Sequence, residues 1–134
     1  MVSNEMKEKL VQLAIEAREK AYVPYSHYQV GAALLTKSGK IFTGVNIENA
    51  AYPTTMCAER VAVFKAVSEG EKEFEAMAVV TANAGFCCGG CRQVLAEFGL
   101  DTLVLIADNQ GNVHFEMTVS ELLPGAFTPE FLEK

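Results

Sequence analysis

The chain has 134 residues, of which half are hydrophobic, and its 11 basic and 17 acidic side chains give a net charge of −6. This length and composition predict a single folded domain over residues 1–134, with neither extensive disorder nor a membrane span. Nucleic-acid binding is disfavoured, because proteins that bind the phosphate backbone usually carry a basic stripe. The first ten residues lack the basic start and apolar block of a signal peptide, so we expect a cytoplasmic protein.

The hydrophobic pattern predicts helices that alternate with apolar strands. The expected order is a helix over 4–21, a β-hairpin over 29–47, a helix over 57–70, a strand over 76–82, a helix over 91–99, a strand over 102–108, an edge strand over 112–119 and an irregular tail over 120–131. Such alternation is typical of an α/β domain layered around one sheet. The hairpin makes that sheet mixed rather than purely parallel.

The four cysteines fall into two groups. Cys87, Cys88 and Cys91 lie within five positions, whereas Cys57 stands alone upstream. In a reducing compartment, clustered cysteines are more often metal ligands or catalytic groups than disulfides. Cys57 and Cys88 also fall at predicted helix starts, where unpaired N–H groups and the helix dipole favour thiolate over thiol.

The segment Cys88-Gly-Gly-Cys91 has the spacing of a metal-binding knuckle. Together with Cys57 it offers three ligands, which is the pattern of a catalytic zinc site that keeps one position open for water. Taken alone, the C-x-x-C motif also fits a redox pair or buried core cysteines. Cys87 could complete a closed four-cysteine site, but adjacent residues rarely direct both side chains at one ion.

Glu59 follows Cys57 by two positions in a mostly apolar helix. A buried carboxylate is costly unless it is paired or used, and near a zinc-activated water it can move protons to a leaving group. The alternative is a solvated surface glutamate. Because three thiolates outweigh a divalent ion, a cation is expected beside the sulfurs. Arg60 and Arg92 are candidates, unless each forms an ordinary surface salt bridge.

The blocks "CAERVAVFKAVSEG" and "CCGGCRQVLAEFG" resemble the small zinc-dependent cytidine deaminases, whose signature has a three-cysteine form. The resemblance continues through "AYVPYSHYQVGAALLT", "GVNIENAAY" and "LLPGAF", and so covers nearly the whole chain. It implies a three-layer α/β/α fold with a mixed sheet of about five strands, one Zn²⁺ per subunit and a homotetramer. The implied reaction is hydrolytic deamination of cytidine and 2′-deoxycytidine to uridine and 2′-deoxyuridine, with release of ammonia, in pyrimidine salvage.

The resemblance also implies a role for particular residues. By position, Cys57, Cys88 and Cys91 would bind zinc, Glu59 would carry protons, and Arg60 would hydrogen-bond to the thiolates. The implied substrate contacts are Asn46 and Glu48 to the ribose, Tyr28 to the pyrimidine ring, Ala58 through its backbone, and Phe127 in a neighbouring subunit's site. Without the resemblance, Asn46 and Glu48 would be ordinary loop residues, Tyr28 a core residue and Phe127 an anchor of the tail.

Three features depart from the family pattern. Cys87 stands where a proline usually precedes the second zinc cysteine, Tyr28 stands where phenylalanine is usual, and segment 81–88 is shorter than in many relatives. The shorter segment predicts a looser rim of the substrate pocket, which would admit cytidines substituted at the exocyclic nitrogen. Alternative hypotheses for the function are a blasticidin S type of deaminase, a deaminase of single-stranded nucleic acid, and a non-catalytic zinc-binding module.

Overall fold

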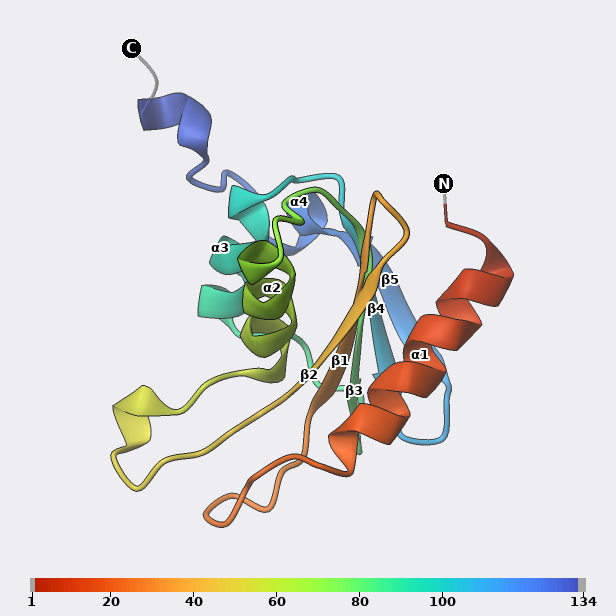
Figure 1. Ribbon diagram of the computed structural model, residues 1–134, viewed down its shortest axis with the longest axis vertical. Coiled ribbons are helices and arrows are strands. Elements are labelled where there is room, and N and C mark those ends of the chain that lie inside the picture. Colours follow the sequence, from red (N-terminus) through yellow and green to blue (C-terminus); the bar gives the residue numbers. More distant parts are fainter. Residues whose placement is uncertain (1, 133–134) are drawn as a thin grey trace.

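The structure is a computed structural model that describes residues 2–132, in which helices cover both faces of one five-stranded sheet (Figure 1). The strands are β1 (Gly31–Thr36), β2 (Ile41–Val45), β3 (Phe74–Thr81), β4 (Leu103–Asp108) and β5 (Val113–Thr118), in the order β2-β1-β3-β4-β5. Strands β3 and β4 are parallel and the other pairs are antiparallel. The predicted mixed sheet and three-layer α/β/α fold are therefore confirmed.

The two faces of the sheet carry different helices. Helix α1 (Asn4–Arg18) covers one face, and α2 (Ala58–Ser68), α3 (Gly89–Glu97) and the short α4 (Val119–Leu122) cover the other (Figure 1). Successive residues of β1 point to opposite faces. Leu35 therefore packs in the core beneath α1, whereas Leu34 packs in the core beneath α2 and α3. Burial on both faces explains why this strand is a continuous apolar run.

Several element boundaries differ from the predictions. Helix α1 ends at Arg18 rather than at residue 21, and α3 begins at residue 89 rather than at 91. The tail, predicted to be irregular, contains α4 and a 3₁₀ turn at Pro129–Leu132. Thr118 and Glu121 form a reciprocal capping box at the start of α4, which is a recognisable S/T-x-x-E signal.

Helix α2 lies unusually close to strand β2. A Cβ atom on Gly44 would lie 2.3 Å from the carbonyl oxygen of Ala58 and 2.6 Å from the amide nitrogen of Ala62, so only glycine allows this approach. The contact fixes the N-terminal end of α2 against the sheet. None of the helices within residues 2–132 has the length and apolar character that a membrane span requires.

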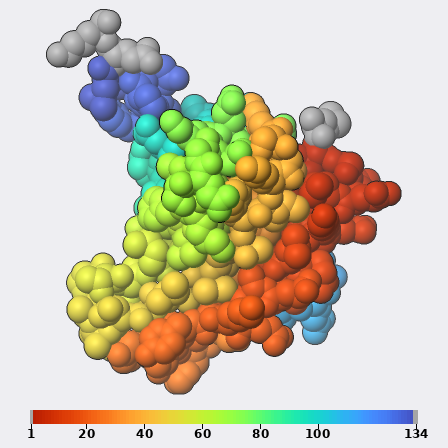
Figure 2. Space-filling model, viewed as in Figure 1, coloured from red at the N-terminus to blue at the C-terminus, as the bar shows by residue number. Residues whose placement is uncertain are grey.

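Two segments project from the body on the side of α2 and α3. One contains the 3₁₀ turn at Tyr52–Thr54, and the other is the end of the described chain (yellow and blue in Figure 2). Both carry exposed aromatic side chains: Tyr52, Phe127 and Phe131.

Candidate active site

Three of the four cysteine sulfurs meet between the N-terminal ends of α2 and α3. Cys57 is the N-cap of α2, Cys88 is the N-cap of α3, and Cys91 lies in the first turn of α3. Their Sγ atoms all lie within 4.8 Å of one another, with 3.9 Å between Cys57 and Cys88 and 3.3 Å between Cys88 and Cys91. The two helix starts therefore converge on one point, as their sequence positions predict.

This cluster has the dimensions of a zinc site. A Zn–S bond of about 2.3 Å in tetrahedral geometry places sulfur atoms about 3.8 Å apart, within the range that the three cysteines span. Cys87 is not part of the cluster. Its thiol is buried beside the Glu59 carboxylate, and this burial raises the pKa of the Cys87 thiol. The donor set is therefore three sulfurs, which leaves one tetrahedral position without a protein ligand.

The thiols of Cys57 and Cys91 have pKa values shifted in opposite directions. Hydrogen bonding with Cys91 lowers the pKa of Cys57 to about 6, and the same contact raises the pKa of Cys91. The contact therefore favours the thiolate form of Cys57 over that of Cys91. A coordinating divalent ion deprotonates its remaining thiols outright.

Glu59 is buried, with only 5% of its surface exposed, although it carries a carboxyl group. It occupies the second position of α2 and lines a cavity together with Cys57 and Cys88. Burial raises the pKa of the Glu59 carboxyl group. The reading of Glu59 as a solvated surface residue is therefore wrong, and a carboxyl group that can hold a proton lies beside the sulfur cluster.

Arg60 supplies positive charge to the cluster. Its Nη2 atom donates to Cys88 Sγ at 3.8 Å, and its Nε atom is buried with no hydrogen-bond partner within the described residues. Hydrogen bonding to Cys91 raises the pKa of the guanidinium. Arg92, the other candidate, instead donates to the carbonyl oxygens of Cys87 at 3.0 Å and Leu122 at 2.8 Å.

The cavity next to the sulfurs has a volume of about 190 Å³. Six residues singled out from the sequence line it: Tyr28, Asn46, Cys57, Ala58, Glu59 and Cys88. Thr81 and Phe86 are among the other lining residues, which sequence reasoning missed. The Phe86 ring packs on Phe115 of β5, with 4.6 Å between centroids. The available signal in the sequence was an aromatic residue two positions before Cys88.

Asn46 and Glu48 both hold the segment that leads to Tyr28. The Asn46 side chain accepts a hydrogen bond from the Val30 amide at 2.9 Å and donates to the Tyr28 carbonyl oxygen at 2.8 Å. The Glu48 carboxylate accepts from the Ser26 amide and hydroxyl. Glu48 lines an adjoining cavity of about 430 Å³, which shares Thr55 with the sulfur-lined cavity, and Glu48 does not itself line the latter.

Phe127 also lies outside the sulfur-lined cavity of its own chain. Its ring stacks on Phe131 with 5.5 Å between centroids, and 56% of its surface is exposed. Its carbonyl oxygen accepts a hydrogen bond from the Gln93 side chain at 2.8 Å, which ties this part of the tail to α3.

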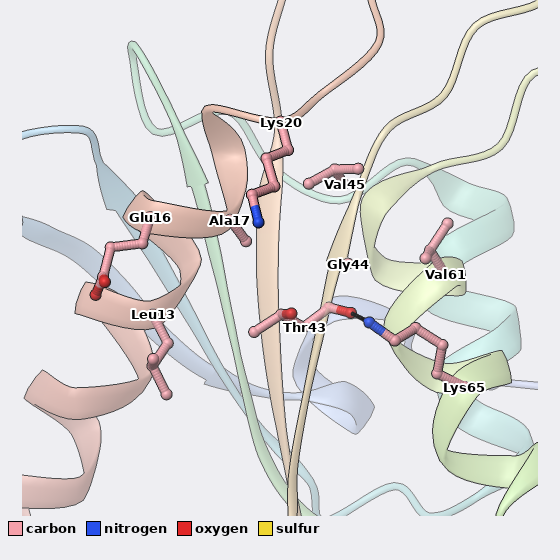
Figure 3. Close-up of a pocket in the computed structure, with 9 residues that line it drawn as sticks. All are labelled: Leu13, Glu16, Ala17, Lys20, Thr43, Gly44, Val45, Val61 and Lys65. Carbon is pink, nitrogen blue, oxygen red and sulfur yellow. Dashed lines mark hydrogen bonds between the residues drawn. The ribbon is translucent and has the colours of Figure 1, made fainter.

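A larger cavity, of about 530 Å³, lies at the open edge of the sheet between α1, β2 and α2 (Figure 3). Its charged side chains are Glu16, Lys20 and Lys65, and Lys65 Nζ donates to the Thr43 carbonyl oxygen. No sulfur or aromatic ring lines it. Chemistry rather than volume therefore identifies the smaller cavity as the candidate active site.

Comparison with known proteins agrees with this geometry. Residues 4–107 match the cytidine and deoxycytidylate deaminase zinc-binding region. The chain is 57% identical over 124 residues to a cytidine deaminase of Halalkalibacterium halodurans, covering 90% of this chain and 93% of that protein. It is 34% identical over 129 residues to a blasticidin-S deaminase of Bacillus cereus, covering 89% and 90% of the two chains.

Among solved structures, a cytidine deaminase from Burkholderia pseudomallei superposes with a TM-score of 0.86 at 44% sequence identity, over 94% of this chain and all of that one. The match to the family covers the sulfur cluster, Glu59 and Arg60, so sequence, fold and site point to the same group of proteins. The chain belongs to the cytidine and deoxycytidylate deaminase zinc-binding family.

Proposed function

We propose that this protein is a zinc-dependent hydrolase that converts cytidine and 2′-deoxycytidine, with water, to uridine and 2′-deoxyuridine and ammonia. The observation that carries the proposal is the buried carboxyl group of Glu59 beside three convergent cysteine sulfurs in a cavity the size of a small ring. Relatives that share 57% and 44% of their residues with this chain are cytidine deaminases, which supports the same substrate.

Cys57, Cys88 and Cys91 would hold the metal ion, one per subunit. When bound, a zinc ion lowers the pKa of a coordinated water molecule and so supplies a nucleophile at neutral pH. Arg60 offsets part of the negative charge of the three sulfurs through its contact with Cys88.

Glu59 moves the protons of the reaction. Its carboxylate accepts a proton from the attacking water and delivers protons to ring nitrogen N3 and then to the departing amine at C4. Burial suits this role, because a raised pKa brings a carboxyl group closer to the operating pH. Proton transfer by one positioned group contributes about 10²–10⁴-fold to a rate.

The remaining residues bind the nucleoside. Tyr28 packs on the pyrimidine ring, and the backbone of Ala58 contacts the base. Asn46 and Glu48 bind the ribose hydroxyls, with the Glu48 carboxylate oriented by its contacts with Ser26. Phe127 reaches the site of a neighbouring subunit.

The proposed assembly is a cytoplasmic homotetramer of single-domain subunits that acts in pyrimidine salvage and binds neither nucleic acid nor membrane. Exposed aromatic rings on the two projecting segments support an assembly, since apolar groups gathered at a surface often mark protein contacts. The net charge of −6 argues against a phosphate-binding groove.

An ultraviolet assay with cytidine tests the proposal, with zinc content measured on the same samples. The wild type should convert cytidine to uridine, and a strong zinc chelator should abolish the conversion. Glu59→Gln should keep its zinc and lose at least about 10²-fold in kcat. Near-normal turnover by zinc-loaded Glu59→Gln would contradict the role of Glu59. If the zinc-loaded wild type does not convert cytidine, blasticidin S is the next substrate to test.

A further inference from the structure

The sulfur-lined cavity is small for a ligand site. Pockets for small molecules usually measure about 300–1,000 Å³, whereas this one measures about 190 Å³. It therefore has room for the ring of a pyrimidine nucleoside, with the sugar at its mouth. The rigid parts of the cavity wall therefore limit the size of a substituent on the pyrimidine ring.

Two segments far apart in the sequence are joined beside this cavity. The Tyr28 hydroxyl donates a hydrogen bond to Asn83 Oδ1 at 2.7 Å. Thr81 Oγ1 donates to the same oxygen at 3.3 Å and itself accepts from the Gly85 amide at 2.8 Å. A Cβ atom on Gly85 would lie only 2.6 Å from the Tyr28 oxygen, so the phenol lies directly against the turn before Phe86.

Tyr28 is also fixed at its backbone. Its amide donates to Ser26 Oγ at 3.0 Å, and its carbonyl oxygen accepts from the Asn46 side chain at 2.8 Å. With the hydroxyl bonded to Asn83, the residue is held at both ends of its backbone and at the tip of its ring.

The backbone on both sides of this contact is strained. Within residues 2–132, the non-glycine residues with positive φ are His27 (58°) and Ala84 (56°). One directly precedes Tyr28 and the other directly follows Asn83. Left-handed conformations of such residues persist only where the surroundings hold them, and they gather at ligand clamps. Both walls are therefore held in one specific conformation.

We propose that the Tyr28–Asn83 hydrogen bond sets the size limit for the base in this active site, and that it selects cytidine against cytidines enlarged at the exocyclic nitrogen. Phenylalanine at position 28 could pack on a ring but could not form this bond. The inference rests on the proposed deaminase function. The shortened segment 81–88 alone predicts a looser rim that admits such cytidines. The inference is the opposite, because the hydrogen bond ties that segment to Tyr28 and closes the rim.

The experiment compares kcat/KM for N4-methylcytidine and for cytidine, the first giving uridine and methylamine and the second uridine and ammonia. The ratio of the two values is measured in the wild type, Tyr28→Phe, Asn83→Ala and the double variant. Each single variant should raise the ratio about fivefold, the factor that one net hydrogen bond represents. The double variant should raise it no further, since both substitutions remove the same bond.

Tyr25→Phe is the matched control, because it removes a phenol hydroxyl from the same segment while its ring remains packed near Tyr52. Its ratio should equal that of the wild type. An unchanged ratio in both single variants, or effects that multiply in the double variant, would overturn the inference while cytidine turnover stands. Failure of the zinc-loaded wild type to convert cytidine would instead overturn the proposed function, and the inference with it.

Discussion

The Nη2 atom of Arg60, in the first turn of α2, lies 3.8 Å from the sulfur of Cys88, the N-cap of α3. A Cβ atom on Gly90 would lie 2.3 Å from the same nitrogen, so a glycine leaves the space that the guanidinium occupies. Residues 57–60 thus supply a sulfur, a carboxyl group and a cation from the first turn of one helix, while α3 supplies the other two sulfurs.

Arg60→Gln tests whether this contact tunes the metal site. Because the substitution removes a cation that offsets thiolate charge, zinc affinity or kcat should fall about 10–100-fold, with little change in Tm. Zinc titration and the cytidine assay measure the two quantities. Arg92→Gln is the matched control and should mainly lower Tm, because it removes hydrogen bonds to two backbone carbonyl oxygens. Equal effects of both variants on zinc affinity would contradict the assignment.

Replacing single cysteines distinguishes the ligands from the neighbouring thiol. Cys87→Ser should keep one zinc per subunit, because Cys87 lies outside the sulfur cluster. Cys88→Ser should lose most of its zinc, since the cluster then offers only two sulfurs. Elemental analysis of zinc per protein gives the answer. Loss of the metal in Cys87→Ser, in protein with an unchanged circular dichroism spectrum, would make Cys87 a ligand.

Gly44→Ala should destabilise the protein by forcing α2 away from β2. The added methyl group would meet the backbone of α2 at 2.3 Å and 2.6 Å, and overpacking of this kind costs about 1–3 kcal/mol. Thermal unfolding should show a Tm several degrees lower. Gly89→Ala is the control, because a Cβ atom there meets no atom within 4 Å, and its Tm should be nearly unchanged.

Glu48 should make stability depend on pH. The hydrogen bond from the Ser26 hydroxyl, with those from two backbone amides, lowers the pKa of the Glu48 carboxyl group below its ordinary value of 4.5. Because the pKa is lower in the folded state, the contribution of Glu48 to the free energy of unfolding is complete above pH 4.5. It is lost as the pH falls through the pKa of the folded state. Wild type should therefore exceed Glu48→Gln in stability at pH 7, and the difference should shrink below pH 4.5.

Urea unfolding of both proteins at several pH values between about 3 and 7 measures that difference, with the m-value showing whether the unfolding transition itself has changed. Repeating the comparison in a Ser26→Ala background should reduce the difference at pH 7, because the largest cause of the lowered pKa is then absent. A difference that does not vary with pH would show that Glu48 acts through packing instead.

Much of the fold could be predicted because its signals are local. The apolar runs of β1 and β3, the glycine turn at Gly39 and the stop at Gly70 each depend on a few neighbouring residues. The end of α1 and the existence of α4 were missed. In α4 the capping box was a local signal that could have been read. Beyond α1 the chain pairs Tyr22 with Ile47, a contact between distant segments that the helical pattern of α1 does not reveal.

The sequence by itself determined the chemistry of the site, namely three sulfurs, one carboxyl group and two candidate cations, since each is a residue type at a fixed spacing along one of two helix starts. The tertiary structure decided which of these groups meet. It gave Arg60 rather than Arg92 to the sulfurs, kept Glu48 with Ser26, and joined Tyr28 to Asn83 across 55 positions. Such contacts depend on how segments distant in the chain pack together, which spacing within one segment does not encode.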